Sequence, residues 1–148
     1  MRHAVLVVVA ALFASCAGSA VASAATPEQR MIGAINHSRH DDGLRKLRAA
    51  PELERSAAAF ARWLVRHDQF AHRPRVSVSR HYPHCGEALA MHFSMAAQVG
   101  GTLRSWLASP VHRGLVMTSS MNLVGVGHAS GRVGGKPKTV WVLQVAHR

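Results

Sequence analysis

Trp106-Leu107-Ala108-Ser109-Pro110-Val111-His112-Arg113 is the stretch around which this chain is organised. Proline at position 110 has no backbone N–H, so the preceding helix is predicted to end near Ala108. Ser109 is a suitable N-cap and Pro110 a natural first residue for a second, short helix. That arrangement places His112 in the first helical turn, where its ring can point into a cleft. His112 is therefore the first candidate site residue.

The start of the chain, residues 1–24, has the pattern of a secretory signal peptide. Arg2 precedes an apolar run from Ala4 to Ala14, and small residues follow as far as Ala22-Ser23-Ala24, which matches a signal peptide with its cleavage site. The run is too short to span a bilayer. A lipoprotein signal, with a lipid on Cys16, is the second interpretation. We expect residues 25–148 to form one extracytoplasmic domain, either secreted or lipid-anchored through Cys16.

The charge is strongly basic, with 18 Lys and Arg against 7 Asp and Glu and a formal net charge of +11. The basic residues are spread along the chain, which favours anionic partners such as cell-envelope polymers or lipid headgroups. General solubility is an equally good interpretation. No aromatic-interleaved basic repeat indicates a dedicated nucleic-acid module.

Cysteine usage excludes a disulfide scaffold if the signal peptide is cleaved, because only Cys85 then remains. Two interpretations of Cys85 stay open at this point. It is a buried apolar residue, which is the commoner case, or a reactive thiol.

Helical patterns dominate the first part of the chain after the leader. Thr26-Pro27-Glu28-Gln29 forms a capping box, and the helix it opens is predicted to stop near Gly43. A second helix is predicted from Pro51 to near Asp68, with one apolar face formed by Leu53, Ala57, Phe60, Ala61 and Leu64. A third helix is predicted to be capped by Ser94 and to bury Met95, Leu103 and Trp106.

Strand patterns dominate the last part. Residues 86–91 form a predicted short strand after a long surface loop over 73–85, and residues 123–129 and 139–146 form a predicted hairpin with a loop over 130–138. Gly125 and Gly127 are interpreted as relieving crowding in a strand, not as cradling phosphate. These elements predict an α+β fold, with helices packed on a small, mainly antiparallel sheet.

A series of short signals follows in a specific order: Asn36 and Arg39, Gly43-Leu44, Leu47, Phe70-Ala71-His72, Gly86-Glu87, the stretch 106–113, and Val124-Gly125-Val126-Gly127. Together they resemble the bacterial branch of the CAP superfamily, the SCP-like extracellular domains related to cysteine-rich secretory proteins, antigen 5 and plant pathogenesis-related proteins. The resemblance covers about Pro27 to Val145. It implies an α-β-α sandwich with a cleft lined by two histidines and, in many members, two glutamates.

The resemblance implies that His72, Glu87 and His112 line the cleft. Ala88 stands where the family motif has asparagine, and Ser109 stands where animal and plant members have the second glutamate. Independently of the family, Glu87 is the only acidic residue after Asp68. A carboxylate isolated in so basic a region is expected either to pair with Arg or His or to have a functional role.

The chemistry of these residues leaves several functions open. Two neutral imidazoles, His72 and His112, are suitable ligands for Zn²⁺ or another divalent cation, with Glu87 as a further ligand. The same residues without metal form a polar ligand pocket, and no short-range motif such as H-E-x-x-H decides between them. No cofactor follows with certainty.

Our leading hypothesis is a non-enzymatic, secreted CAP-type domain that binds a small ligand or divalent cation through His72, Glu87, His112 and Ser109. In this hypothesis a basic surface faces anionic envelope polymers or lipids. The alternative is a metal-dependent hydrolase acting on peptide or cell-wall substrates, with Glu87 as general base. A third hypothesis is that the net positive charge alone binds the protein to anionic surfaces, without any role for the cleft.

Overall fold

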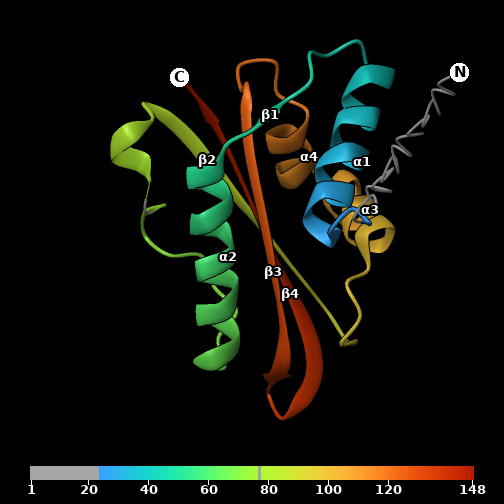
Figure 1. Cartoon of the computed structure of the whole chain (residues 1–148), viewed down its shortest axis with the longest axis vertical. Helices are drawn as coiled ribbons and strands as arrows, with labels where there is room; N and C mark the ends of the chain where they lie inside the picture. The colour runs from blue at the N-terminus through green and yellow to red at the C-terminus, as the bar shows by residue number, and fades with distance from the viewer. Residues whose placement is uncertain (1–23, 77) are drawn as a thin grey trace, which may run out of the picture.

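The computed structural model describes residues 24–76 and 78–148, which form three layers (Figure 1). Residues 1–23, which contain Cys16 and nearly all of the predicted signal peptide, lie outside the described residues. In the described part, no helix is long and apolar enough to cross a membrane. The helices and strands are α1 (Pro27–Asp41), β1 (Arg48–Ala49), α2 (Pro51–Arg66), the 3₁₀ turn η1 (Ser79–His81), β2 (His84–His92), α3 (Val99–Ala108), α4 (Pro110–Val116), β3 (Leu123–Val133) and β4 (Lys136–His147).

The middle layer is a four-stranded sheet with the order β1-β3-β4-β2. The short strand β1 runs parallel to β3, and the β3–β4 and β4–β2 pairs are antiparallel. Helix α2 covers one face of the sheet, and α1, α3 and α4 cover the other (Figure 1). The predicted α+β class and the α-β-α sandwich are confirmed.

Strand β4 is central and is buried on both faces, as its nearly continuous apolar sequence indicates. Trp141, Leu143 and Val145 pack in one cluster with α1 and α3. Val140 and Val142 alternate with them and pack against α2. Strand β2 pairs with β4 and is the last strand in the described sheet, so it forms an edge.

Helix α1 begins as the capping box predicts. Thr26 Oγ1 accepts a hydrogen bond from the Gln29 amide, and Gln29 Oε1 accepts one from the Thr26 amide. Gly43 follows the helix with φ of +71°, a conformation that suits glycine. Near the end of α1, Arg39 is fully buried, and its guanidinium donates to the carbonyl oxygens of Val116 (2.7 Å) and Thr118 (2.9 Å). This contact fixes the end of α4 against α1.

Helix α2 also confirms the prediction, because all five residues of its apolar face are buried. It packs very closely on β3 at two glycines. A Cβ atom on Gly125 would lie 2.2 Å from the carbonyl carbon of Leu53, and one on Gly127 would lie 2.2 Å from the amide nitrogen of Ala58. The two glycines therefore relieve crowding between a helix backbone and a strand, which confirms the interpretation of Gly125 and Gly127 made from the sequence.

The helix break at Pro110 is placed as predicted. Helix α3 ends at Ala108, Ser109 is extended (φ −90°, ψ 119°), and Pro110 is the first residue of α4. The Ser109 side chain makes no capping hydrogen bond, so the proline and the extended backbone define this break.

The predicted cap of the third helix is wrong. Helix α3 begins at Val99 with Gln98 at the N-cap, and Met95 is 55% exposed instead of buried in the core. Ser94 forms a local turn, in which its Oγ accepts from the Ala96 amide at 3.0 Å. Its carbonyl oxygen accepts from Thr139 Oγ1 at 2.7 Å. Serine side chains compete in this way with helix formation.

The predicted loop over residues 130–138 is also wrong. The β3–β4 ladder continues to the pair Val133–Lys136, and only Gly134 and Gly135 form the turn. Their φ values of +60° and +69° suit a tight two-residue hairpin. Pro137 lies beyond the last β2 pair, His92 with Thr139, so its missing N–H costs no bond to that strand.

The space around each glycine predicts opposite effects on stability for two substitutions to alanine, one at the α2–β3 contact and one on the open side of α1. Gly127→Ala forces the helix away from the sheet and is expected to lower the free energy of unfolding by about 3 kcal/mol. Gly33→Ala, on α1 where a Cβ meets nothing within 4 Å, is expected to raise it by about 0.5–1 kcal/mol. Urea unfolding followed by circular dichroism measures both, and equal effects would contradict the close packing.

Candidate functional site

The three residues expected in the cleft come from three separate parts of the chain. His72 lies in the segment after α2, Glu87 lies on the edge strand β2, and His112 lies in the first turn of α4. All three line one cavity of about 460 Å³. The other lining residues are Gly86, Val111, Gly114, Leu115 and Thr118. The structure thus brings the imidazole rings and the carboxylate to a common cavity at the edge of the sheet.

Glu87 is the most constrained of the three, with a side chain only 5% exposed. Its Oε1 lies 3.2 Å from Nδ1 of His72. Its Oε2 accepts hydrogen bonds from Gln144 Nε2 at 3.0 Å and from Arg73 Nη2 at 3.3 Å. The expectation that this isolated carboxylate pairs with arginine or histidine is met by both residue types.

Two of these partners, Arg73 and Gln144, were not singled out from the sequence. Gln144 is fully buried on β4, directly opposite Glu87 in the ladder. The available signal was a single polar residue inside the apolar run from Val140 to Ala146. Arg73 adjoins His72, and its Nη2 also donates to Ser56 Oγ on α2 at 3.3 Å.

His112 reaches the cavity because α4 packs tightly on β2. A Cβ atom on Gly86 would lie 2.3 Å from Cδ1 of Leu115, so a side chain at position 86 would require the Leu115 side chain to move. Arg39 holds the other end of α4 through the carbonyl oxygen of Val116. The Leu115 contact at Gly86 and the bond from Arg39 both hold α4 beside the edge strand.

Comparisons with known proteins place this arrangement in a family. The model of the cysteine-rich secretory protein family, CAP, matches residues 32–145. The chain belongs to the CAP family. No similar sequence is found among curated proteins.

Solved structures share the fold of this CAP domain at low sequence identity. An outer surface protein from Borrelia burgdorferi has a TM-score of 0.64 at 16% identity, with 80% of this chain and 90% of that chain covered. An extracellular protein containing a SCP domain from Bacillus anthracis has a TM-score of 0.67 at 18% identity, with 82% and 40% covered. This chain therefore spans less than half of the Bacillus protein. Venom allergen-like protein 4 from Schistosoma mansoni has a TM-score of 0.64 at 13% identity, with 84% and 90% covered.

Ser109, the fourth residue predicted for the site of this CAP domain, lies at the helix break beside it. It is half-buried at the break between α3 and α4, and it is not among the residues that line the cavity. It immediately precedes α4, so it is close in sequence to His112. His81 and His84, in the loop and at the start of β2, are exposed and do not line this cavity either.

The arrangement does not fit a preformed metal centre. Within residues 24–76 and 78–148, no group of three His, Cys, Asp or Glu side chains is placed so that it could hold a metal ion. Glu87 is instead bonded to His72, Arg73 and Gln144, and the guanidinium of Arg73 places positive charge where a cation would add more. Metal binding through His72 and His112 stays a prediction from the sequence.

Cys85 lies beside the site on β2 and is half-buried. Burial, and secondarily the negative charge of Glu87, raise the pKa of the Cys85 thiol. A raised pKa disfavours the nucleophilic thiolate, so the structure supports the interpretation of Cys85 as a packing residue over that of a reactive thiol.

The raised pKa predicts how Cys85 reacts with iodoacetamide in a chain carrying Cys16→Ser. The rate should rise with pH at a higher midpoint in the folded protein than in the same protein in urea, because folding disfavours the thiolate. Glu87→Gln should lower that midpoint, whereas Glu54→Gln, which removes a charge elsewhere, should not. Identical midpoints for folded and unfolded protein would contradict the effect of burial.

Proposed function

We propose that this CAP domain is a non-enzymatic binding protein that takes a small polar ligand in the cleft formed by His72, Glu87 and His112. The observation that carries the proposal is the convergence of these side chains from three segments on one cavity. Two imidazoles offer hydrogen-bond donors or acceptors, and Glu87 is held in place by Arg73 and Gln144. A carboxylate so firmly bonded suits orientation of a ligand better than proton transfer.

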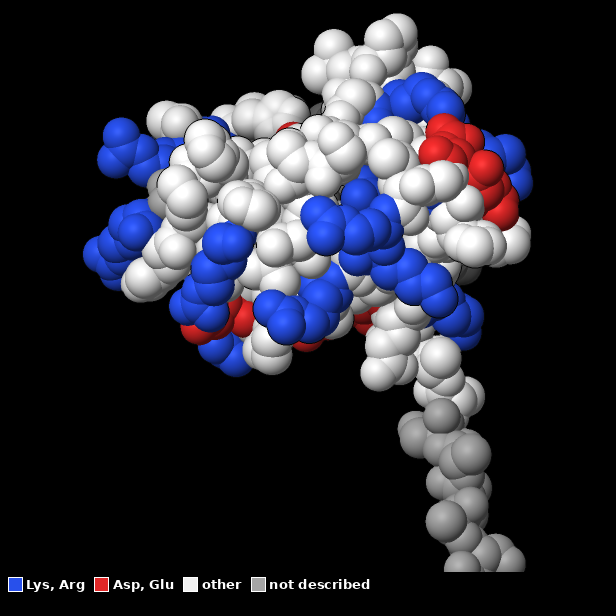
Figure 2. All heavy atoms as spheres, turned by 90° about the horizontal axis from the view of Figure 1, so that it is seen from above, with Lys and Arg blue, Asp and Glu red and all other residues white. Residues whose placement is uncertain are grey.

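A second part of the proposal concerns the surface and the location of the protein. Lys and Arg side chains are scattered over the face seen in Figure 2, with few acidic side chains between them. The signal-peptide pattern of residues 1–24 supports a location outside the cytoplasm, where anionic envelope polymers or lipids are the partners that a basic surface would attract. Extracellular location of the SCP-domain protein from Bacillus anthracis supports the same compartment.

One described patch is especially suited to a lipid surface. Phe93 is 73% exposed, and the Nζ atoms of Lys136 and Lys138 lie 5.8 Å and 5.1 Å from the centre of its ring. Met95, 55% exposed, follows Phe93 closely in sequence. Aromatic and apolar side chains flanked by lysines are typical of surfaces that enter the headgroup region of anionic bilayers.

The cleft is tested by a thermal-shift screen of small polar metabolites, followed by calorimetry of the compounds that stabilise the protein. We expect binding to be lost in the double variant His72→Ala with His112→Ala and retained in the control His40→Ala with His147→Ala, whose histidines are exposed and outside the cleft. Zinc chloride is a separate probe in the same calorimetry, and heat lost in the cleft variant would assign a cation to the site. Equal binding by wild type and the cleft variant would remove the cleft from the proposal.

The surface is tested with vesicles of phosphatidylglycerol and of phosphatidylcholine. We expect binding to the anionic vesicles that weakens as salt is added, because screening reduces attraction between exposed charges. Lys136→Gln with Lys138→Gln should weaken it by roughly 1 kcal/mol per lysine, whereas Arg30→Gln with Arg62→Gln, an equal loss of charge elsewhere, should have less effect. Cosedimentation measures binding, and equal losses in the two variants would show that net charge alone acts.

A further inference from the structure

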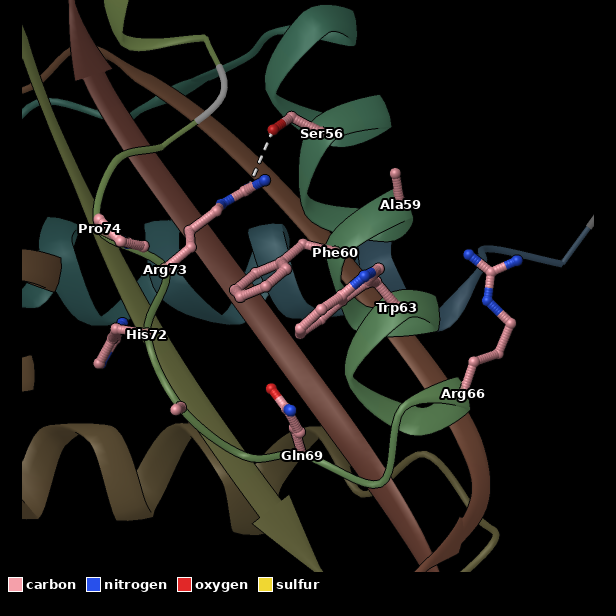
Figure 3. Close-up of a pocket in the computed structure, with 10 residues that line it drawn as sticks. Ser56, Ala59, Phe60, Trp63, Arg66, Gln69, His72, Arg73 and Pro74 are labelled. Carbon is pink, nitrogen blue, oxygen red and sulfur yellow. Dashed lines mark hydrogen bonds between the residues drawn. The ribbon is translucent and has the colours of Figure 1, made fainter.

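A second cavity of about 620 Å³ lies between α2 and the segment Gln69–Pro74. It is lined from the helix by residues that include Phe60, Trp63 and Arg66, and from the segment by residues that include Gln69 and Arg73. Figure 3 shows the rings of Phe60 and Trp63 projecting from α2 toward this segment. His72 lines this cavity as well as the cleft, so the two spaces adjoin at His72.

The helix side of the cavity is an aromatic wall. The ring centres of Phe60 and Trp63 are 6.0 Å apart at an interplanar angle of 24°, and those of Trp63 and His67 are 4.4 Å apart at 23°. Trp63 is 38% exposed, while the other two tryptophans, Trp106 and Trp141, are at most 1% exposed. Trp63 is therefore not used in the core, and the part of its indole that Phe60 and His67 leave uncovered is open to a ligand.

The charge around this wall is positive. Arg66 and Arg73 line the cavity, and among the described residues no carboxylate lines it. The guanidinium carbon of Arg73 lies 4.1 Å from the centre of the Phe60 ring, and Arg73 is anchored to Ser56 and Glu87. Arg66 lines the same cavity from the C-terminal end of α2, where its side chain is exposed. A cation would be repelled here, and the largely apolar walls offer a sugar few hydrogen-bonding partners.

We propose that the cavity between α2 and Gln69–Pro74 binds a small aromatic carboxylate. The ring lies against Phe60 and the exposed part of Trp63, and the carboxylate pairs with the guanidinium of the exposed Arg66. Arginine suits this pairing, because its planar fork matches a carboxylate. The site goes beyond the proposed function, since its wall and its cation come from α2 and not from the His72, Glu87 and His112 cleft.

Naphthoate is the probe that tests this site in the full domain. Its binding should quench the emission of Trp63, the one exposed tryptophan of the three in the chain. Arg66→Gln should weaken naphthoate binding by roughly tenfold, the equivalent of one charge-assisted hydrogen bond. Arg62→Gln is the matched control on the same helix, because Arg62 does not line the cavity, and it should leave the affinity unchanged.

Ligand chemistry and packing are tested separately. Decanoate, an aliphatic carboxylate, and naphthylmethanol, an uncharged aromatic, should each bind at least roughly tenfold more weakly than naphthoate. Trp63→Ala and the more conservative Trp63→Leu should abolish binding measured by calorimetry, with thermal unfolding as the check that each variant is folded. Absence of naphthoate binding to the wild type, equal affinity for decanoate, or unchanged affinity in the folded Trp63 variants would overturn the proposal.

Discussion

The buried carboxylate of Glu87 is the constraint on which the site depends. A charge with a side chain 5% exposed is costly unless it is paired and hydrogen-bonded. Gln144 satisfies part of this need from within the sheet, and Arg73 supplies the opposite charge. Because Arg73 is also bonded to Ser56, the same pairing holds the segment after α2 against the helix. The segment then lines the aromatic cavity, and its His72 also lines the cleft.

Close packing of the helices on the sheet at three glycines is the second requirement for forming the site. Gly125 and Gly127 let α2 lie directly on β3, and Gly86 lets Leu115 of α4 press against the edge strand. A side chain at Gly125 or Gly127 would separate α2 from the sheet, because the nearest atoms there are backbone atoms of the helix.

Local signals predicted the elements that depend on short-range physics. The capping box at Thr26, the apolar face of α2 and the break at Pro110 each involve groups within a few residues of one another. The two errors arose where long-range contacts decide. Ser94 bonds to Thr139 of β4 instead of capping a helix, and the sheet extends the hairpin to the glycine turn although Pro137 suggested a loop.

The sequence by itself determined the fold class and most of the helix boundaries, and the order of family motifs pointed to three of the residues that line the cleft, His72, Glu87 and His112. It also indicated that Glu87, alone among basic residues, needs a partner. Only the tertiary structure decided which partners those are, because Arg73 and Gln144 are 14 and 57 residues away and meet Glu87 through a loop and a strand ladder. It likewise decided that Ser109 stays out of the cavity, and that Trp63 faces a cavity instead of the core. Those outcomes depend on how layers pack, which no local pattern encodes.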